Sequence, residues 1–222
     1  MILAFDTSGP VGSVAVAAGA DVLARGVMTR QAGHAALLVP TIDDVLDDAG
    51  VDREEIALIV VGEGPGSFTG VRVAAATAKG LGRALGVPVR AVSSLAAAAF
   101  SADAGAIRYA IFDARAERVY AACWGVGSDH CEELIAPTSG ELRDLMAGDV
   151  PPGAVFVGDA AQKHRALIEA AGHPVVAAER ERPHADGLVA FAARVPGAPV
   201  DDLGAWEPAY VRASSAERLW KS

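Results

Sequence analysis

The sequence feature that most constrains the fold is an uninterrupted run of six apolar residues at 56–61. The run has the length of a strand and no polar position that would give it a solvent face, so we expect a strand buried on both sides. Such a strand needs helices over both faces of its sheet, which favours an α/β fold. A glycine-rich loop follows at 62–66, then a predicted helix at 67–85 and a strand at 89–92.

The pattern of residues before this run predicts a three-stranded antiparallel meander and one helix. An apolar segment at 2–5 ends in the turn residues Asp6, Thr7 and Ser8, and further strands are expected at 13–17 and 22–28. A helix fits residues 35–49, with Gly50 as its C-terminal cap. Pro40 predicts a kink in this helix, or a regular helix that begins only there.

The second half resembles a smaller, incomplete copy of the first. Strands are expected at 109–112, 118–124, 154–157 and 174–178, and helices at 162–171 and 185–194, with a loop at 196–208. We therefore predict two lobes, residues 1–104 and a reduced lobe 105–222, with a C-terminal tail able to pack back on the first lobe.

Charge and composition narrow the classes of function. The formal net charge is −9, with 28 acidic residues against 19 lysines and arginines, so tight binding of RNA by this chain alone is not expected. The two cysteines lack metal or redox spacing and are expected to be free thiols. The N-terminus carries no signal-peptide pattern, and no apolar stretch is long enough to span a membrane. We expect a cytoplasmic protein with no membrane partner.

Several motifs together resemble one family. The most specific is the segment 62–72, Gly-Glu-Gly-Pro-Gly-Ser-Phe-Thr-Gly-Val-Arg. It is accompanied by Ala-Lys-Gly-Leu at 78–81, His34 ahead of Leu-Val-Pro at 38–40, Asp-Ala-Arg at 113–115 and Pro-Ala-Tyr-Val-Arg at 208–212. With the Asp-Thr-Ser turn at 6–8, they resemble the TsaB (YeaZ-like) family within the actin/Hsp70-like ATPase (ASKHA, RNase H-like) fold.

The resemblance implies an accessory role in transferring threonylcarbamoyl to the N6 of adenosine beside the anticodon of tRNA. It implies a TsaD-like catalytic subunit and a TsaE-like ATPase as partners, with tRNA contacted only through the complex. Whether the free protein forms a homodimer stays open. Two alternatives are an independent small-molecule kinase of the ATPase fold and, on the family's older naming, a glycoprotease of the M22 type.

No arrangement of residues predicts a metal site or a nucleophile. The five histidines, among them His34 and His130, include no pair at helical spacing, and Leu38 stands four residues after His34 where a second ligand would be needed. Ser67 does not lie in a Gly-x-Ser-x-Gly motif and is better explained as a helix N-cap. Cys123 has no histidine near it in sequence, and Asp113 and Arg115 are expected to pair across a hairpin. We predict no catalytic residue and no metal.

A nucleotide site is considered at two loops. Asp6, Thr7 and Ser8 are the candidate for a vestigial phosphate loop, and residues 158–161 are the candidate for its counterpart. Gly64, Gly66 and Ser67 offer backbone N–H groups ahead of a helix, an arrangement that suits anions. We favour the simpler interpretation, in which the polar side chains shape a turn. No cofactor is predicted, apart from ATP or ADP held at an interface with partner subunits.

The helix at 67–85 is the strongest indication of a partner surface. At about 100° per residue, Arg72, Lys79 and Arg83 fall within about 40° of one another, and the remaining surface is apolar or small. The helix at 35–49 offers a core stripe of Ala35, Val39, Ile42, Leu46 and Ala49 beside an acidic edge. The predicted docking residues on the two helices are Leu37, Thr41, Asp44, Asp48, Arg72, Val73, Thr77, Gly80 and Ala84.

Overall fold

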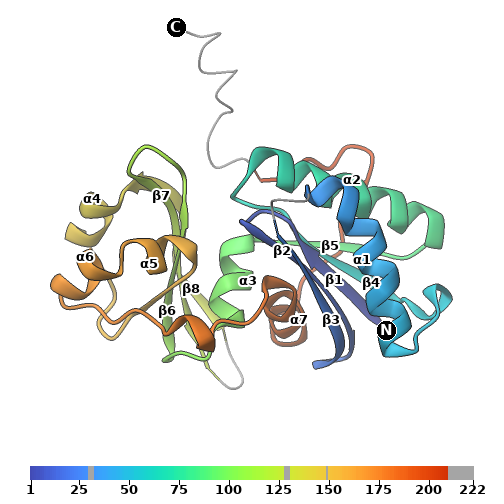
Figure 1. Cartoon of the computed structure of the whole chain (residues 1–222), viewed down its shortest axis with the longest axis horizontal. Helices are drawn as coiled ribbons and strands as arrows, with labels where there is room; N and C mark the ends of the chain where they lie inside the picture. Colours follow the sequence, from blue (N-terminus) through green and yellow to red (C-terminus); the bar gives the residue numbers. More distant parts are fainter. Residues whose placement is uncertain (30–32, 128–130, 149, 210–222) are drawn as a thin grey trace, which may run out of the picture.

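The computed structural model describes residues 1–29, 33–127, 131–148 and 150–209. The chain forms two mixed sheets with a layer of helices between them and further helices outside each sheet (Figure 1). The architecture therefore belongs to the expected α/β class, with two lobes.

The first sheet has the strand order β3-β2-β1-β4-β5. Its strands are β1 (Ile2–Asp6), β2 (Val11–Ala18), β3 (Asp21–Thr29), β4 (Leu58–Gly62) and β5 (Val89–Val92). The central strand β1 pairs antiparallel with β2 and parallel with β4. Leu3, Ala4 and Phe5 are all fully buried, on alternating faces, because helices cover both sides of the sheet.

Two pairs of helices cover the first sheet. The outer pair is α1 (His34–Ala49) and α2 (Phe68–Leu85), and the inner pair is α3 (Ser94–Ser101) and α7 (His184–Arg194). The inner pair packs closely because Gly187 of α7 lies directly against the backbone of Ala97 in α3, where a side chain would not fit.

The second sheet has the strand order β8-β7-β6-β9. Its strands are β6 (Ile107–Asp113), β7 (Arg118–Val126), β8 (Cys131–Glu141) and β9 (Val155–Val157), and its outer helices are α4 (Leu142–Ala147), α5 (Asp159–Lys163) and α6 (Arg165–Ala170). Phe112 and Trp124 on its inner face share one apolar core with Leu95 of α3 and Leu188 of α7. The two sheets are therefore joined by one core through the inner helices.

The predicted elements of the first half are confirmed, with ends shifted by a few residues. Ser67 is the N-cap of α2, and its hydroxyl accepts a hydrogen bond from the N–H of Gly70 at 3.4 Å. Gly50 caps α1 in the left-handed conformation, and α1 continues through Pro40. A short 3-10 helix, η2 (Arg53–Glu55), precedes β4.

The second half departs further from expectation. The predicted helix at 162–171 is wrong as one helix, because the chain forms α5 and α6 with a break at His164. The predicted strand at 174–178 is also wrong: Val175 makes a single bridge to Phe156, and the 3-10 helix η3 (Ala178–Arg180) follows. Neither α3 nor β8 has a predicted counterpart. All eight residues of α3 are buried, so no polar face marks it as a helix.

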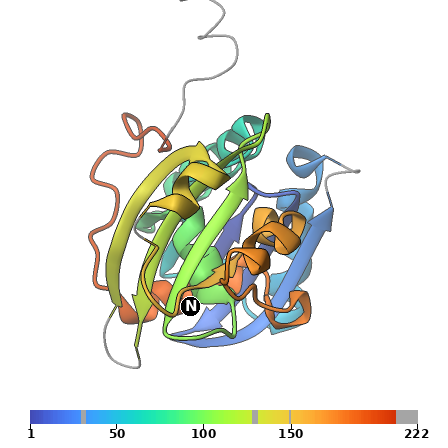
Figure 2. The same cartoon turned by 90° about the vertical axis from the view of Figure 1, so that its left-hand side faces the viewer.

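The described part of the C-terminal segment, 196–209, lies along the first lobe. The N–H of Val200 donates to the carbonyl of Val89 in β5 at 2.8 Å, and the indole N–H of Trp206 donates to Glu63 at 3.4 Å. In Figure 2 this red segment runs along the side of the molecule opposite the blue strands. The α7 helix also packs on the first sheet, although it follows the second sheet in the chain. The lobe boundary near residue 104 stays a prediction.

Candidate functional site

The glycine-rich loop and the start of α2 pack directly on the turn after β1. The N–H of Ser67 donates to the carbonyl of Ser8 at 2.7 Å. A Cβ on Gly66 would lie 2.5 Å from the same carbonyl oxygen, and one on Gly70 would overlap the carbonyl of Thr7. Gly64 has a φ of 93°. These glycines thus allow two loops to touch, and the Ser67 N–H is already used inside the protein.

The turn residues Asp6, Thr7 and Ser8 are buried, and two of their side-chain polar atoms bond to the backbone, whereas Asp6 Oδ2 and Ser8 Oγ have no partner among the described residues. One carboxylate oxygen of Asp6 accepts a hydrogen bond from the N–H of Ser8 at 2.6 Å, and the Thr7 hydroxyl donates to the carbonyl of Gly70 at 2.7 Å. These bonds have the side-chain-to-backbone pattern of a shaped turn, which supports the simpler interpretation of this loop.

The loop at 158–161 is tied to the end of β6. Asp159 accepts hydrogen bonds from the N–H groups of Asp113, at 3.3 Å, and Ala160, at 2.9 Å. Burial raises the pKa of the Asp159 carboxyl, while these two N–H groups act in the opposite direction. The predicted pairing of Asp113 with the Arg115 side chain is corrected. The Asp113 carboxylate pairs with Lys163 at 3.0 Å, and Arg115 contributes its backbone N–H.

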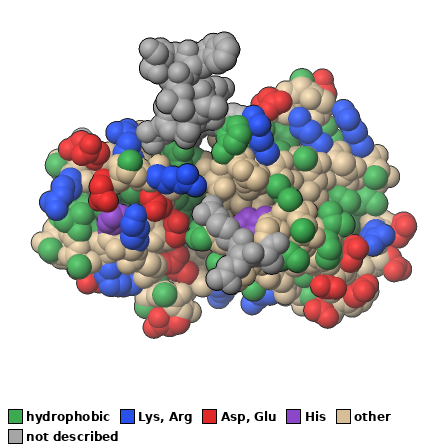
Figure 3. Space-filling view, turned by 45° about the horizontal axis from the view of Figure 1, so that its top comes forward, with side chains coloured by type: hydrophobic (Ala, Val, Ile, Leu, Met, Phe, Trp, Pro, Cys, Tyr) green, Lys and Arg blue, Asp and Glu red, His purple; other side chains and the backbone are tan. Residues whose placement is uncertain are grey.

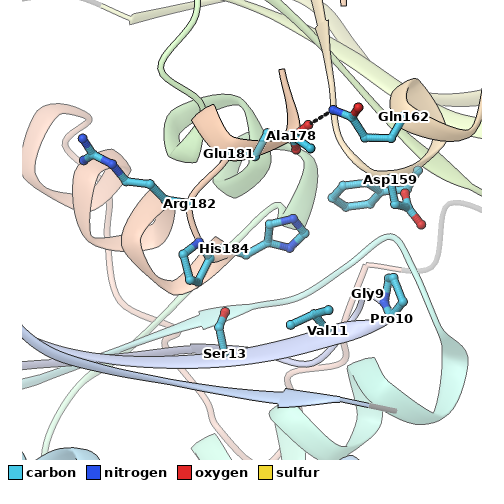
Figure 4. A pocket seen from close by; sticks show the side chains of 12 residues that line it. Gly9, Pro10, Val11, Ser13, Asp159, Gln162, Ala178, Glu181, Arg182 and His184 are labelled. Atoms are coloured by element: carbon cyan, nitrogen blue, oxygen red, sulfur yellow. Dashed lines mark hydrogen bonds between the residues drawn. The ribbon is translucent and has the colours of Figure 1, made fainter. Parts of the chain in front are cut away.

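A cavity of about 340 Å³ lies between the two lobes, beside these loops (Figure 4). It is lined by Gly9, Pro10, Val11, Ser13, Phe112, Asp159, Gln162, Ala178, Glu181, Arg182, Pro183 and His184. The His184 ring stacks on Phe112 with 5.2 Å between centroids. Its Nδ1 lies 3.9 Å from an Asp6 carboxylate oxygen, and neither atom has a hydrogen-bond partner among the described residues.

His34 and Cys123, the candidate metal ligand and the candidate nucleophile, are both buried, and Nε2 of His34 has no hydrogen-bond partner among the described residues. His34 is buried at the start of α1, and Leu38 lies in the core. Among the described residues no three or more histidines, cysteines or acids come together as a metal site; His130 lies outside the described residues. Burial raises the pKa of the Cys123 thiol to about 11, which keeps it protonated near neutral pH.

The α2 helix exposes a flank of small residues. Gly70, Val71, Ala74, Ala75, Ala78 and Gly82 form its buried side. Gly80 is exposed, with no atom within 4 Å of where its Cβ would be, and Ala84 is also exposed. The opposite flank carries Lys79, whose ammonium donates to the carbonyl of Gly204 at 3.4 Å, so the segment 196–209 lies on that side. The flank with Val73, Thr77, Gly80 and Ala84 therefore faces towards α1.

The α1 helix places its predicted docking residues away from α2. A Cβ on Gly26 in β3 would lie 2.6 Å from the Thr41 methyl group, so Thr41 points towards β3. Leu37, Asp44 and Asp48 share that flank at helical spacing. On the other flank, Asp43 pairs with Arg53 of η2 at 2.8 Å. The structure thus does not bring the two halves of the predicted docking surface together; their roles stay predictions.

One candidate contact residue was assigned to the core by the sequence pattern. Val39 is 48% exposed, whereas Leu38 beside it is fully buried, so the predicted core stripe is wrong by one residue at this turn. Ala35 is also exposed. Val39 lies on the same side of α1 as Asp43, towards α2. The sequence of Leu38 and Val39 alone does not determine which of the two side chains faces the sheet.

Comparison with known proteins identifies relatives. The profile of the TsaD family, tRNA N6-adenosine threonylcarbamoyltransferase, matches residues 26–195. The Bacillus subtilis tRNA threonylcarbamoyladenosine biosynthesis protein TsaB is 29% identical over 99% of this chain and 97% of its own. The solved structure of YeaZ from Pseudomonas aeruginosa has a TM-score of 0.76 at 29% identity, over 94% of this chain and 98% of that one.

A more distant structure bears on the fold alone. Component A of the (R)-2-hydroxyglutaryl-CoA dehydratase from Acidaminococcus fermentans matches with a TM-score of 0.53 at 12% identity, over 86% of this chain and 97% of that one. The expected resemblance to TsaB and the expected actin-like ATPase fold are confirmed. In the described part of the chain, no helix is both long and apolar enough to cross a bilayer.

Proposed function

Because this chain belongs to the TsaD family and resembles TsaB along its whole length, we propose that it is an accessory subunit of the tRNA threonylcarbamoyladenosine pathway. It holds a TsaD-like catalytic subunit in the complex that transfers threonylcarbamoyl to the N6 of tRNA adenosine. It has no catalytic activity of its own, and tRNA reaches it only through the complex.

The observation that carries this proposal is the α1-facing flank of α2. Gly80 and Ala84 leave the helix backbone open to close approach by a partner helix, which gives dense dispersion contacts. Val39 adds an exposed apolar side chain on the neighbouring helix. An exposed small-residue flank beside an apolar group suits a protein interface better than contact with water.

The internal bonding of the two loops supports the accessory role. In the turn after β1, one carboxylate oxygen of Asp6 and the hydroxyl of Thr7 are used in hydrogen bonds within the protein. A TsaE-like ATPase as a further partner, a homodimer of the free protein and ATP or ADP at a subunit interface are parts of the same proposal, as is a cytoplasmic location.

The test is reconstitution with the TsaD-like subunit of the same organism. We expect co-purification of the two chains, and modification of tRNA only when this chain is present. Gly80→Arg and Thr77→Glu should each weaken the association at least tenfold, because a long or charged side chain blocks close helix packing. Ala166→Arg, at an exposed position of α6, is the matched control and should bind normally.

Binding by folded Gly80→Arg and Thr77→Glu variants at the strength of the natural protein would remove this surface from the proposal. Full tRNA modification without this chain would remove the accessory role itself.

The interlobe cavity supports one rival function, an independent ATPase-fold kinase. It lies between the two loops considered for phosphate, with one Asp6 carboxylate oxygen unpartnered beside it. Calorimetry with ATP and Mg²⁺ distinguishes the kinase function from the accessory role. Micromolar binding that Asp6→Ala abolishes would favour the kinase, whereas the accessory role predicts no such binding by the isolated chain.

A further inference from the structure

The four outer edges of the two sheets are protected unequally. The edge of β5 is covered by the segment 196–209 through Val200, and β9 is bridged by Val175. The edge strand β8 carries Pro137 and three glutamates, at 132, 133 and 141, which are common protections of an exposed edge. The remaining edge strand, β3, lies opposite the covered edge of its sheet (Figure 2).

The regular part of this edge is the six-residue stretch from Ala24 to Thr29. The pairing with β2 shifts at Leu23, where a bulge interrupts the ladder, and is regular from Ala24 onwards. This stretch contains no proline. Its one charged side chain, Arg25, is paired with Asp186 of α7 at 3.1 Å. The stretch thus offers a row of main-chain groups without the usual protection of a free edge.

The two faces beside this edge differ in chemistry. Val27 lies on the same face as Arg25, towards α7, and is 58% exposed. On the other face, α1 extends over the edge with Thr41 on Gly26, and Asp44 and Asp48 of the same flank are exposed. In Figure 3 acidic side chains gather at the lower right, on the side where Figure 1 places α1. A segment lying along β3 would therefore meet the apolar side chain of Val27 on the face towards α7. On the face towards α1 it would meet the carboxylates of Asp44 and Asp48.

We propose that the edge of β3 from Ala24 to Thr29 binds an extended segment of a partner polypeptide, with apolar side chains on one face and lysine or arginine on the other. The main-chain ladder selects a polypeptide, because only a strand repeats donors and acceptors at this spacing. The aspartates of α1 select the charge on one face of that strand. This inference goes beyond the proposed accessory role and does not depend on it.

The test uses a defined probe, a fluorescein-labelled eight-residue peptide of alternating valine and lysine with blocked ends. We expect saturable binding in fluorescence anisotropy. Val27→Lys and Thr29→Lys should each weaken binding roughly tenfold, because they place a charge against the apolar face. Asp44→Asn combined with Asp48→Asn should weaken binding and reduce its dependence on salt. Leu134→Lys, at an exposed apolar position on the edge strand β8 of the other sheet, is the matched control and should bind normally.

A second peptide, N-methylated at alternate residues, separates main-chain pairing from simple charge attraction. Loss of its binding supports the proposal, and binding equal to that of the first peptide overturns it. Unchanged binding by folded Val27→Lys and Thr29→Lys also overturns it. So does a dimer of the natural chain in sedimentation that Val27→Lys makes monomeric, because the edge would then belong to a second copy. None of these measurements involves a TsaD-like subunit, so this inference and the accessory role fail separately.

Discussion

At the scale of single residues, the glycines of α2 serve opposite purposes. Gly70 lies where any side chain would overlap the carbonyl of Thr7, whereas Gly80 faces open space on the same helix. The first glycine lets the helix start against the turn after β1. The second has no role inside the described fold, which is why we assign it to an external contact.

This contrast predicts that two identical substitutions act in opposite directions. Gly70→Ala should destabilise the protein by about 2 kcal/mol or more, because the added methyl group forces the helix away from the turn. Gly80→Ala should raise the free energy of unfolding by about 0.5–1 kcal/mol, because alanine favours the helix. Urea denaturation followed by circular dichroism measures both, and equal effects would contradict the packing described at Gly70.

At the scale of elements, the segment 196–209 attaches to the glycine-rich loop through a half-buried carboxyl group. Burial raises the pKa of Glu63 above its ordinary value of 4.5, and the hydrogen bond from Trp206 opposes this only partly. The folded protein therefore holds the Glu63 proton more tightly than the unfolded chain does. Stability contributed by this group is present at low pH and is lost as the pH rises through the folded pKa.

The expected consequence is a pH-dependent difference between the natural protein and Glu63→Gln. The variant should be the more stable of the two at pH 7, because its neutral amide avoids the cost of burying a charge while still accepting a hydrogen bond from Trp206. The difference should shrink as the pH falls through the folded pKa of Glu63. Thermal unfolding from pH 4 to pH 8 measures it; a difference that grows on acidification would show that the sign is wrong.

At the scale of the whole molecule, the two sheets depend on one shared helical layer. The inner helix α7 is far from β1 in the chain, yet it packs against the first sheet. The N-terminal end of α7 is bonded to the same sheet, since the N–H of Ala185 donates to the hydroxyl of Ser13 at 3.0 Å. A lobe cut at residue 104 would lose this helix and expose the apolar face that it covers.

We therefore expect the fragment 1–104 to be unfolded or aggregated on its own, whereas the full chain unfolds in one cooperative transition. Near-ultraviolet and far-ultraviolet circular dichroism should give coincident melting curves for the full chain. A fragment 1–104 that is monomeric with a cooperative melting curve would contradict the dependence on α7. The fragment 1–104 with α7 joined through a flexible linker is the matched comparison and should recover folded structure.

Local patterns in the sequence determined much of the first lobe. The buried run at 56–61, the Asp-Thr-Ser turn, the Gly50 cap and the Ser67 N-cap each depend on neighbours a few residues away, so they can be predicted without a fold. The motif at 62–72 pointed to the family for the same reason. Local patterns predicted the second half less well. The predicted helix at 162–171 is two short helices with a break, and the predicted strand at 174–178 is a single bridge.

Only the tertiary structure decided what depends on contacts between distant segments. The eight buried residues of α3 have no polar face, so nothing in their order marks a helix until two sheets enclose it. The contact of the Thr41 methyl group with Gly26 of β3 shows which flank of α1 faces β3. In this orientation of the helix, Val39 lies at the surface and not in the expected core. Which edge of a sheet stays open depends on where remote segments lie, and no local pattern carries that information.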